Sequence, residues 1–143
     1  MIKDRLLILA IGTNHQSWNN IRRAKRMVRE AFPESLVVYS SIAVTTPIGI
    51  SGKNFRNCLT AFLTDLDIEE VVRRTKQIET LCGNTQEKRA CGIVEMDIDV
   101  LFHHGQYYHE KDWERPYVRQ LLSELLPATI IPSPQHSKIA RNE

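Results

Sequence analysis

Cysteine is scarce in this sequence of 143 residues, which contains Cys58, Cys82 and Cys91. The number is odd, and no two of these cysteines show the C-x-x-C spacing that is typical of zinc sites and redox motifs. A disulfide framework is not expected either, because such frameworks pair an even number of cysteines in oxidising compartments. The pattern favours reduced thiols in a cytoplasmic protein.

The sequence also lacks a large excess of charge and a long apolar run. Its 19 basic and 17 acidic side chains leave a formal net charge of +2, whereas binding to nucleic acid or membrane by bulk electrostatics needs a concentrated basic field. The apolar run Leu6–Ile11 is too short to span a bilayer and is followed by no signal-peptide cleavage pattern. We therefore expect neither a nucleic-acid partner nor a membrane partner.

What is present is the hydrophobic content of an ordinary single domain, 42% of residues. Hydrophobic periodicity predicts, in order, a strand at 5–11, a helix at 20–32, strands at 36–44 and 55–64, a helix after an N-cap at 67, and a strand at 95–102. This β-α-β-β-α-β order indicates an α+β, ferredoxin-like sandwich, with an antiparallel sheet and helices on one face. We expect one domain over residues 1–127, ending in a helix at 116–126, and a loosely ordered tail at 128–143.

The segment EMDIDVLF at residues 95–102 alternates polar and apolar side chains, as a half-buried strand does. The side chains expected to face the core are Met96, Ile98, Val100 and Phe102. Glu95, Asp97 and Asp99 would then stand in a row on the other face, although like charges on one face repel and acidic residues are poor strand formers.

Two explanations of this acidic row remain open from spacing alone. Carboxylates at positions i and i+2 of a strand share one surface and suit a hard cation such as Mg²⁺, which is commonly held by one or two carboxylates plus substrate phosphates. Alternatively, Asp97 and Asp99 lie on a solvated face and pair with nearby Lys or Arg side chains.

Several short segments follow one another in a distinctive order: AIGTN, TTPIG, NFRNCL, QIETLCG, EMDIDVLF and HEKDWERPYVRQLLSELLP. In this order the sequence, over about residues 5–127, resembles the family of 6-hydroxymethyl-7,8-dihydropterin pyrophosphokinases, also named 2-amino-4-hydroxy-6-hydroxymethyldihydropteridine diphosphokinases. The resemblance implies a kinase of folate biosynthesis that transfers the diphosphate of ATP to a hydroxymethyl pterin with two Mg²⁺ ions. It also implies small-molecule partners, and we expect a monomer.

The resemblance assigns roles to particular positions. Asp97 and Asp99 would hold the two Mg²⁺ ions under the ATP phosphates. The pterin would lie between the rings of Phe55 and Tyr117, with its polar edge bound by Asn57. The remaining pterin contacts would come from Thr46, Pro47 and Ile48. Phe55 and Tyr117 have an alternative interpretation as ordinary core residues.

Five further residues fall at ATP-binding positions of the family: Glu79, Lys88, Arg89, His109 and Arg115. An arginine suits phosphate because its guanidinium group offers several donors in a fixed geometry. Each also has a simpler interpretation, with Glu79 as a surface carboxylate and Lys88 and Arg89 as the tip of an exposed loop.

The chain departs from the family in the loop before the acidic strand. Asn84, Gln86 and Val94 stand where the family has arginines, and Cys91 stands where it has a tryptophan. Since charge-assisted contacts to phosphate are worth several kcal/mol in such reactions, these departures predict reduced activity unless Lys88 and Arg89 compensate. The alternative function is a degenerate, non-catalytic module that binds a pterin or a nucleotide. An RNA-binding module is disfavoured because no strand carries the aromatic motif of that class.

Overall fold

The computed structural model describes residues 2–47 and 52–127, together with 130 and 134. A short 3-10 helix, η1 (Ile2–Asp4), precedes the first strand. The strands are β1 (Leu6–Thr13), β2 (Val38–Tyr39), β3 (Ala43–Thr45), β4 (Phe55–Leu63), β5 (Asp97–His103) and β6 (Gln106–Tyr107). The α-helices are α1 (Ser17–Ala31), α2 (Ile68–Leu81), α3 (Gln86–Ala90), α4 (Glu110–Trp113) and α5 (Pro116–Leu125). No helix in this described part of the chain is long and apolar enough to cross a membrane.

Within the described residues, the strands form one antiparallel sheet in the order β2-β4-β1-β5-β6, and β3 also pairs with β4. β1 is central, between β4 and β5. Its leucine and isoleucine side chains are buried on both sides, which explains why its sequence is almost continuously apolar rather than alternating. The predicted α+β class and antiparallel sheet are confirmed.

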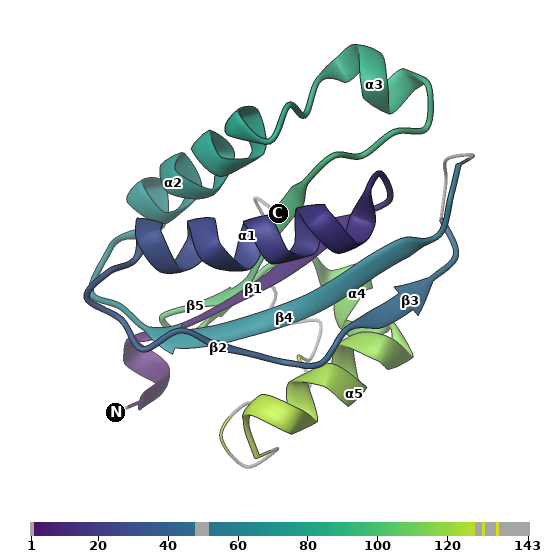
Figure 1. Ribbon diagram of the computed structural model, residues 1–143. Coiled ribbons are helices and arrows are strands. Elements are labelled where there is room, and N and C mark those ends of the chain that lie inside the picture. The colour runs from purple at the N-terminus through teal and green to yellow at the C-terminus, as the bar shows by residue number, and fades with distance from the viewer. Residues whose placement is uncertain (1, 48–51, 128–129, 131–133, 135–143) are drawn as a thin grey trace.

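Helices cover the two faces of the sheet unequally. Figure 1 shows α1 and α2 on one face and α5 on the opposite face. Leu7, Leu9 and Ile11 of β1 belong to the core under α1 and α2, whereas Leu6 and Ile8 pack in the core that includes α5. The two helices of the β-α-β-β-α-β unit therefore share one face, as predicted, but α4 and α5 add a third layer, which corrects the expectation of helices on one face alone.

The predicted strand at 36–44 is divided into β2 and β3. Between them, Ser40 takes over the pairing with β4: its backbone N–H donates to the Leu59 carbonyl at 2.9 Å, and its Oγ accepts from Leu59 N–H at 2.9 Å. The loop at 84–93 contains the short helix α3, which begins after Thr85, whose hydroxyl accepts from Lys88 N–H at 3.2 Å. The cap predicted for α2 is present, because Asp67 accepts from Glu70 N–H at 2.9 Å.

A bulge in β5 changes the direction of its last side chains. Ile8 is opposite Phe102 and Leu9 is opposite Val100, so Leu101 is the extra residue. Met96, Ile98 and Val100 point into the core under α1 and α2, as predicted. Phe102 belongs instead to the core under α5, and its predicted orientation was wrong because alternation is broken at the bulge.

The acidic row is also shorter than predicted. Glu95 precedes β5 and its side chain is bound by Lys88 Nζ at 3.0 Å and by the His15 ring. Glu95 therefore has partners of its own in the loops next to α1 and α3. Asp97 and Asp99 are the carboxylates that remain together on the face toward α5.

Candidate functional site

A cavity of about 270 Å³ opens on the part of the α5 face that α5 leaves uncovered. It lies where β1 ends and where β4 and β5 begin, because antiparallel neighbours bring these ends to the same edge of the sheet. The residues that line it are Ala10, Ile11, Gly12, Thr45, Thr46, Phe55, Asn57, Arg89, Val94, Asp97, Asp99, Asp112, Arg115 and Tyr117.

Many of the residues selected from the sequence converge on this cavity. Those that line it are Thr46, Phe55, Asn57, Arg89, Asp97, Asp99, Arg115 and Tyr117. They come from β4, β5, α3, α5 and the segments beside α5 and β3, far apart along the chain. His109 lines an adjoining cavity of about 410 Å³, which shares Asp112 and Arg115 with the first. Glu79, Lys88 and Pro47 are not among the lining residues, and Ile48 lies outside the described residues.

The floor of the cavity is made of small residues of β1. Gly12 lies opposite Asn57 on β4 and opposite Asp97 on β5, and Ala10 lies opposite Asp99. A Cβ atom at Gly12 would come within 3.0 Å of Asn57 Oδ1 and 3.6 Å of Phe55 Cδ1. The absence of that atom therefore keeps the space between the two neighbouring strands open.

Asn57 is buried and held in a fixed orientation. Its Nδ2 donates to Thr45 Oγ1 at 2.8 Å and weakly to the Ala43 carbonyl at 3.4 Å. These bonds occupy the amide nitrogen and leave Oδ1 on the side of Gly12. A buried amide needs partners of this kind, so β3 has the role of orienting Asn57 toward the cavity.

The two carboxylates of β5 are in different electrostatic environments. Asp97 Oδ1 accepts from Arg89 Nη2 at 3.0 Å. Asp99 Oδ1 lies 3.9 Å from His109 Nε2, which is an ion-pair distance but too long for a hydrogen bond. Burial, followed by the nearby Asp97 charge, raises the pKa of Asp99 to about 6. The pair thus concentrates negative charge that a cation would stabilise.

Glu79 is buried rather than exposed, so the surface interpretation was wrong. Its Oε2 accepts from Ile98 N–H at 2.7 Å, and its Oε1 lies 3.5 Å from Lys76 Nζ. Burial raises the pKa of Glu79, although the Ile98 N–H opposes this. Because Ile98 stands between Asp97 and Asp99, Glu79 fixes the backbone from which both carboxylates project. Sequence spacing gave no sign of this contact.

Lys88 and Arg89 are neighbours on α3 with different partners. Lys88 Nζ donates to Gly83 O and Glu95 Oε2, each at 3.0 Å, whereas Arg89 reaches into the cavity toward Asp97. Val94 is buried at the cavity wall. Arg89 therefore places a guanidinium group beside Asp97, in a cavity that Val94 lines with an apolar side chain.

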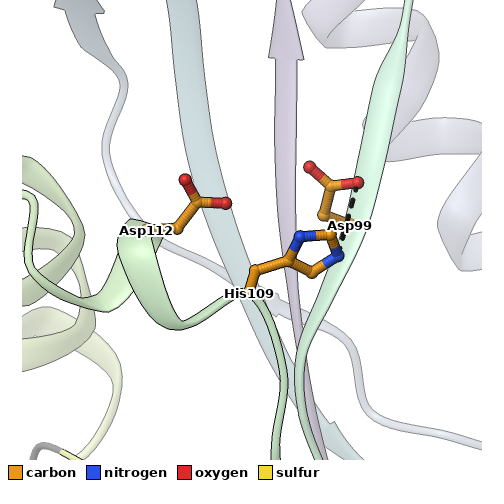
Figure 2. Close-up of side chains that lie close together, drawn as sticks. All are labelled: Asp99, His109 and Asp112. Atoms are coloured by element: carbon orange, nitrogen blue, oxygen red, sulfur yellow. Dashed lines mark ion pairs between the residues drawn. The ribbon is translucent and has the colours of Figure 1, made fainter. Parts of the chain in front are cut away.

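Asp112 is a site residue that the sequence analysis missed. It lines both cavities, and its Oδ1 lies 3.3 Å from Arg115 Nη2. Its ligand atom and those of Asp99 and His109 all lie within 4.8 Å of one another, and Figure 2 shows the three side chains gathered between β5 and α4. The available signal was the short separation of Asp112 from His109 and Arg115, the two residues already selected in this segment.

Comparison with known proteins agrees with the family resemblance of the sequence. Residues 8–127 match the family model described as 7,8-dihydro-6-hydroxymethylpterin-pyrophosphokinase. The Arabidopsis thaliana folate synthesis bifunctional protein is 28% identical over 131 residues, which cover 84% of this chain and 27% of that protein. This chain thus spans about a quarter of the length of that plant relative.

A bacterial relative has nearly the length of the matched region. The 2-amino-4-hydroxy-6-hydroxymethyldihydropteridine pyrophosphokinase of Porphyromonas gingivalis is 24% identical over 135 residues, covering 85% of this chain and 91% of that protein. Among solved structures, the C-terminal domain of the MgtC protein from Mycobacterium tuberculosis aligns with a TM-score of 0.39 and 8% identity, covering 70% of this chain and 90% of that domain. A structural likeness this low supports no argument.

Proposed function

Because the chain belongs to the 7,8-dihydro-6-hydroxymethylpterin-pyrophosphokinase family, we propose that it transfers the diphosphate of ATP to 6-hydroxymethyl-7,8-dihydropterin. The observation that supports this most is the gathering of residues from distant segments around one cavity with Asp97 and Asp99 at its base.

In the proposed complex the pterin ring lies between Phe55 and Tyr117. Both side chains are partly buried at the cavity wall, and Tyr117 also packs against the core under α5. Flat heterocycles bind well between aromatic faces because area is buried while polar ring edges stay available for hydrogen bonds. Asn57 Oδ1 would accept from the pyrimidine edge of the pterin, and Thr46 would contact the same end.

The donor chemistry of Asp97 and Asp99 fits Mg²⁺. Each offers carboxylate oxygen, each is partly exposed, and they lie side by side on one face of β5. When bound, Mg²⁺ neutralises charge on the phosphates during transfer. Binding of the cation would also compete with Arg89 for Asp97, and the released guanidinium group could then bind a phosphate oxygen. Glu79 keeps both carboxylates in place through Ile98 N–H.

The reaction follows from this arrangement. The hydroxymethyl oxygen of the pterin attacks the β-phosphorus in line, the bond between that phosphorus and the oxygen of AMP breaks, and the hydroxyl proton passes to solvent. Catalysis comes from positioning and from stabilisation of charge rather than from a covalent intermediate. Arg115, at the end of the cavity that it shares with His109, would contact the triphosphate.

The second candidate is a non-catalytic binding module with the same ligands. Val94 favours it, because this apolar side chain lines the cavity at a position where the sequence resemblance implies an arginine. A product assay by mass with ATP, Mg²⁺ and the pterin separates the two. We expect AMP and the pterin diphosphate in equal amounts; pterin binding by calorimetry without product would support the passive module. Binding of neither ligand would exclude both.

We also propose that the protein acts as a cytoplasmic monomer on small molecules. Light scattering on a sizing column tests the monomer directly. A mass near 16.5 kDa is the expected result, and twice that value would contradict it.

A further inference from the structure

Asp99, His109 and Asp112 form a group of metal-ligating side chains whose composition differs from that of the Asp97 and Asp99 pair. Their ligand atoms lie within 4.8 Å of one another. They come from β5, from the residue before α4, and from α4 itself (Figure 2). One imidazole nitrogen and two carboxylates therefore face a common space at the boundary of the two cavities.

The packing of α4 fixes this arrangement. Trp113, next to Asp112, is buried, and its indole N–H lies 3.1 Å from the Leu101 carbonyl on β5 and 3.0 Å from the Tyr108 carbonyl. His109 has a left-handed backbone conformation, with φ of 55°, just before α4 begins. A short helix anchored to β5 by a buried indole thus holds His109 and Asp112 beside Asp99, which stands two residues before Leu101.

The chemistry of the three ligands favours one class of cation. Mg²⁺ prefers an all-oxygen environment, whereas imidazole nitrogen suits transition metals such as Fe²⁺, Ni²⁺ and Zn²⁺. Mn²⁺ belongs to the same row of transition metals, and carboxylate and water ligands suit it as well. Two carboxylates would neutralise a divalent ion, and the imidazole would add selectivity. Asp112 Oδ1 is close to Arg115, but at 3.3 Å this contact leaves the carboxylate a second oxygen.

We propose that Asp99, His109 and Asp112 bind a divalent transition-metal ion in the absence of nucleotide. Mn²⁺ is the ion used to test this proposal. This inference rests on the proposed function in one respect, since the ion would lie where the ATP phosphates are expected. It adds two ligands, His109 and Asp112, and a metal preference to that function. Asp99 would be shared between this ion and the pair with Asp97.

The test measures Mn²⁺ binding to the full chain without nucleotide, by the loss of the free-ion electron paramagnetic resonance signal. We expect the unchanged protein to bind Mn²⁺ at least about tenfold more tightly than Mg²⁺, as measured by competition, because Mg²⁺ gives up its water ligands reluctantly and takes oxygen ligands. His109→Gln and Asp112→Asn should each weaken Mn²⁺ binding by about tenfold or more. Glu114→Gln is the matched control, because it removes the same charge from an exposed position in the same segment, and it should leave binding unchanged.

A spectroscopic readout separates ligation from a general effect of charge. Pulsed paramagnetic resonance of the Mn²⁺ complex should show coupling to an imidazole nitrogen, and His109→Gln should remove it. Melting curves of each variant check that the fold is intact. Absence of nitrogen coupling, or equal Mn²⁺ affinity in all variants, would overturn the proposal and leave Asp112 as a residue that only orients Arg115.

The outcomes also separate this inference from the proposed function. Mn²⁺ binding with nitrogen coupling but no diphosphate transfer would preserve the metal site and contradict the enzyme. Diphosphate transfer with Mg²⁺, but no Mn²⁺ binding in the absence of nucleotide, would support the enzyme and contradict the metal site.

Discussion

The face of the sheet under α1 and α2 and the face under α5 are built from the same strands but are covered to different extents. α1 and α2 have 15 and 14 residues, or about 21–22 Å each, whereas α5 has 10 residues, or about 15 Å. β4 has nine residues, about 30 Å. α5 is therefore about half as long as the strand it packs against.

The residues of β1, β4 and β5 change in character where α5 ends. Under α5 the face is apolar, with Leu6, Ile8, Leu59, Ala61 and Leu101 in one cluster. Beyond it the same rows continue as Ala10, Gly12, Asn57, Asp97 and Asp99, which line the cavity. The covered face shows no such change, since Leu7, Leu9 and Ile11 are all buried in its core. A short helix over a longer sheet thus divides one face into a core and a site.

The largest expected effect is on turnover, at the cavity that α5 leaves uncovered. Asp99→Asn should lower kcat by about a thousandfold, because about 4 kcal/mol of charge stabilisation is lost. The melting temperature should stay the same or rise, since the amide removes repulsion from Asp97 at a partly buried position. Product formation and thermal unfolding are measured on the same sample. A variant that keeps its turnover would contradict the metal-binding role of Asp99.

The covered face should respond in the opposite way. Leu9→Ala removes a fully buried side chain from the core under α1 and α2 and should lower the free energy of unfolding by about 2–5 kcal/mol. Urea denaturation measures this loss. Because Leu9 does not line the cavity, kcat per folded molecule should change less than twofold, and a large fall in kcat would show that the two faces are not independent.

The sequence predicted the features that depend on local pattern. The N-cap at Asp67, the apolar course of β1 and the class of the sheet follow from periodicity and capping chemistry. The orientation of Phe102 did not, because a bulge is set by the pairing of β5 with β1 rather than by its own residues. Within the candidate site, family resemblance selected residues from distant segments that line one cavity.

Two contacts of the site lay beyond sequence reasoning for a different reason. Glu79 and Ile98 are 19 positions apart, and the hydrogen bond between them exists only because α2 packs along the edge of β5. Asp112 faces Asp99 because a buried indole holds α4 against that strand. Both depend on how separate elements meet, which a periodic pattern does not specify.

An intermediate effect is expected at Glu79 of α2, which holds the backbone of β5 between Asp97 and Asp99. Glu79→Leu leaves the buried Ile98 N–H without an acceptor, and should lower the free energy of unfolding by about 1–3 kcal/mol. Since Ile98 lies between Asp97 and Asp99, the Glu79→Leu variant should also bind Mn²⁺ more weakly. Glu79→Gln is the matched variant, because its amide oxygen can still accept from Ile98. Equal behaviour of the two variants in unfolding and in Mn²⁺ titration would contradict a positioning role.

The smallest effect is expected at the floor of the cavity, where the site depends on a missing side chain. Gly12→Ala adds a Cβ within 3.0 Å of Asn57 Oδ1, so Asn57 must move by a few tenths of an ångström. Its amide is held by Thr45 and by the Ala43 carbonyl, and this movement should weaken pterin binding by about 1 kcal/mol, or roughly fivefold in Kd. Calorimetry with the pterin measures the loss. Nucleotide affinity should stay unchanged, because the atoms within 4 Å of the added Cβ belong to Asn57 and Phe55 and not to Asp97 or Asp99. A parallel loss of nucleotide affinity would mean that the two substrates do not occupy separate ends of the cavity.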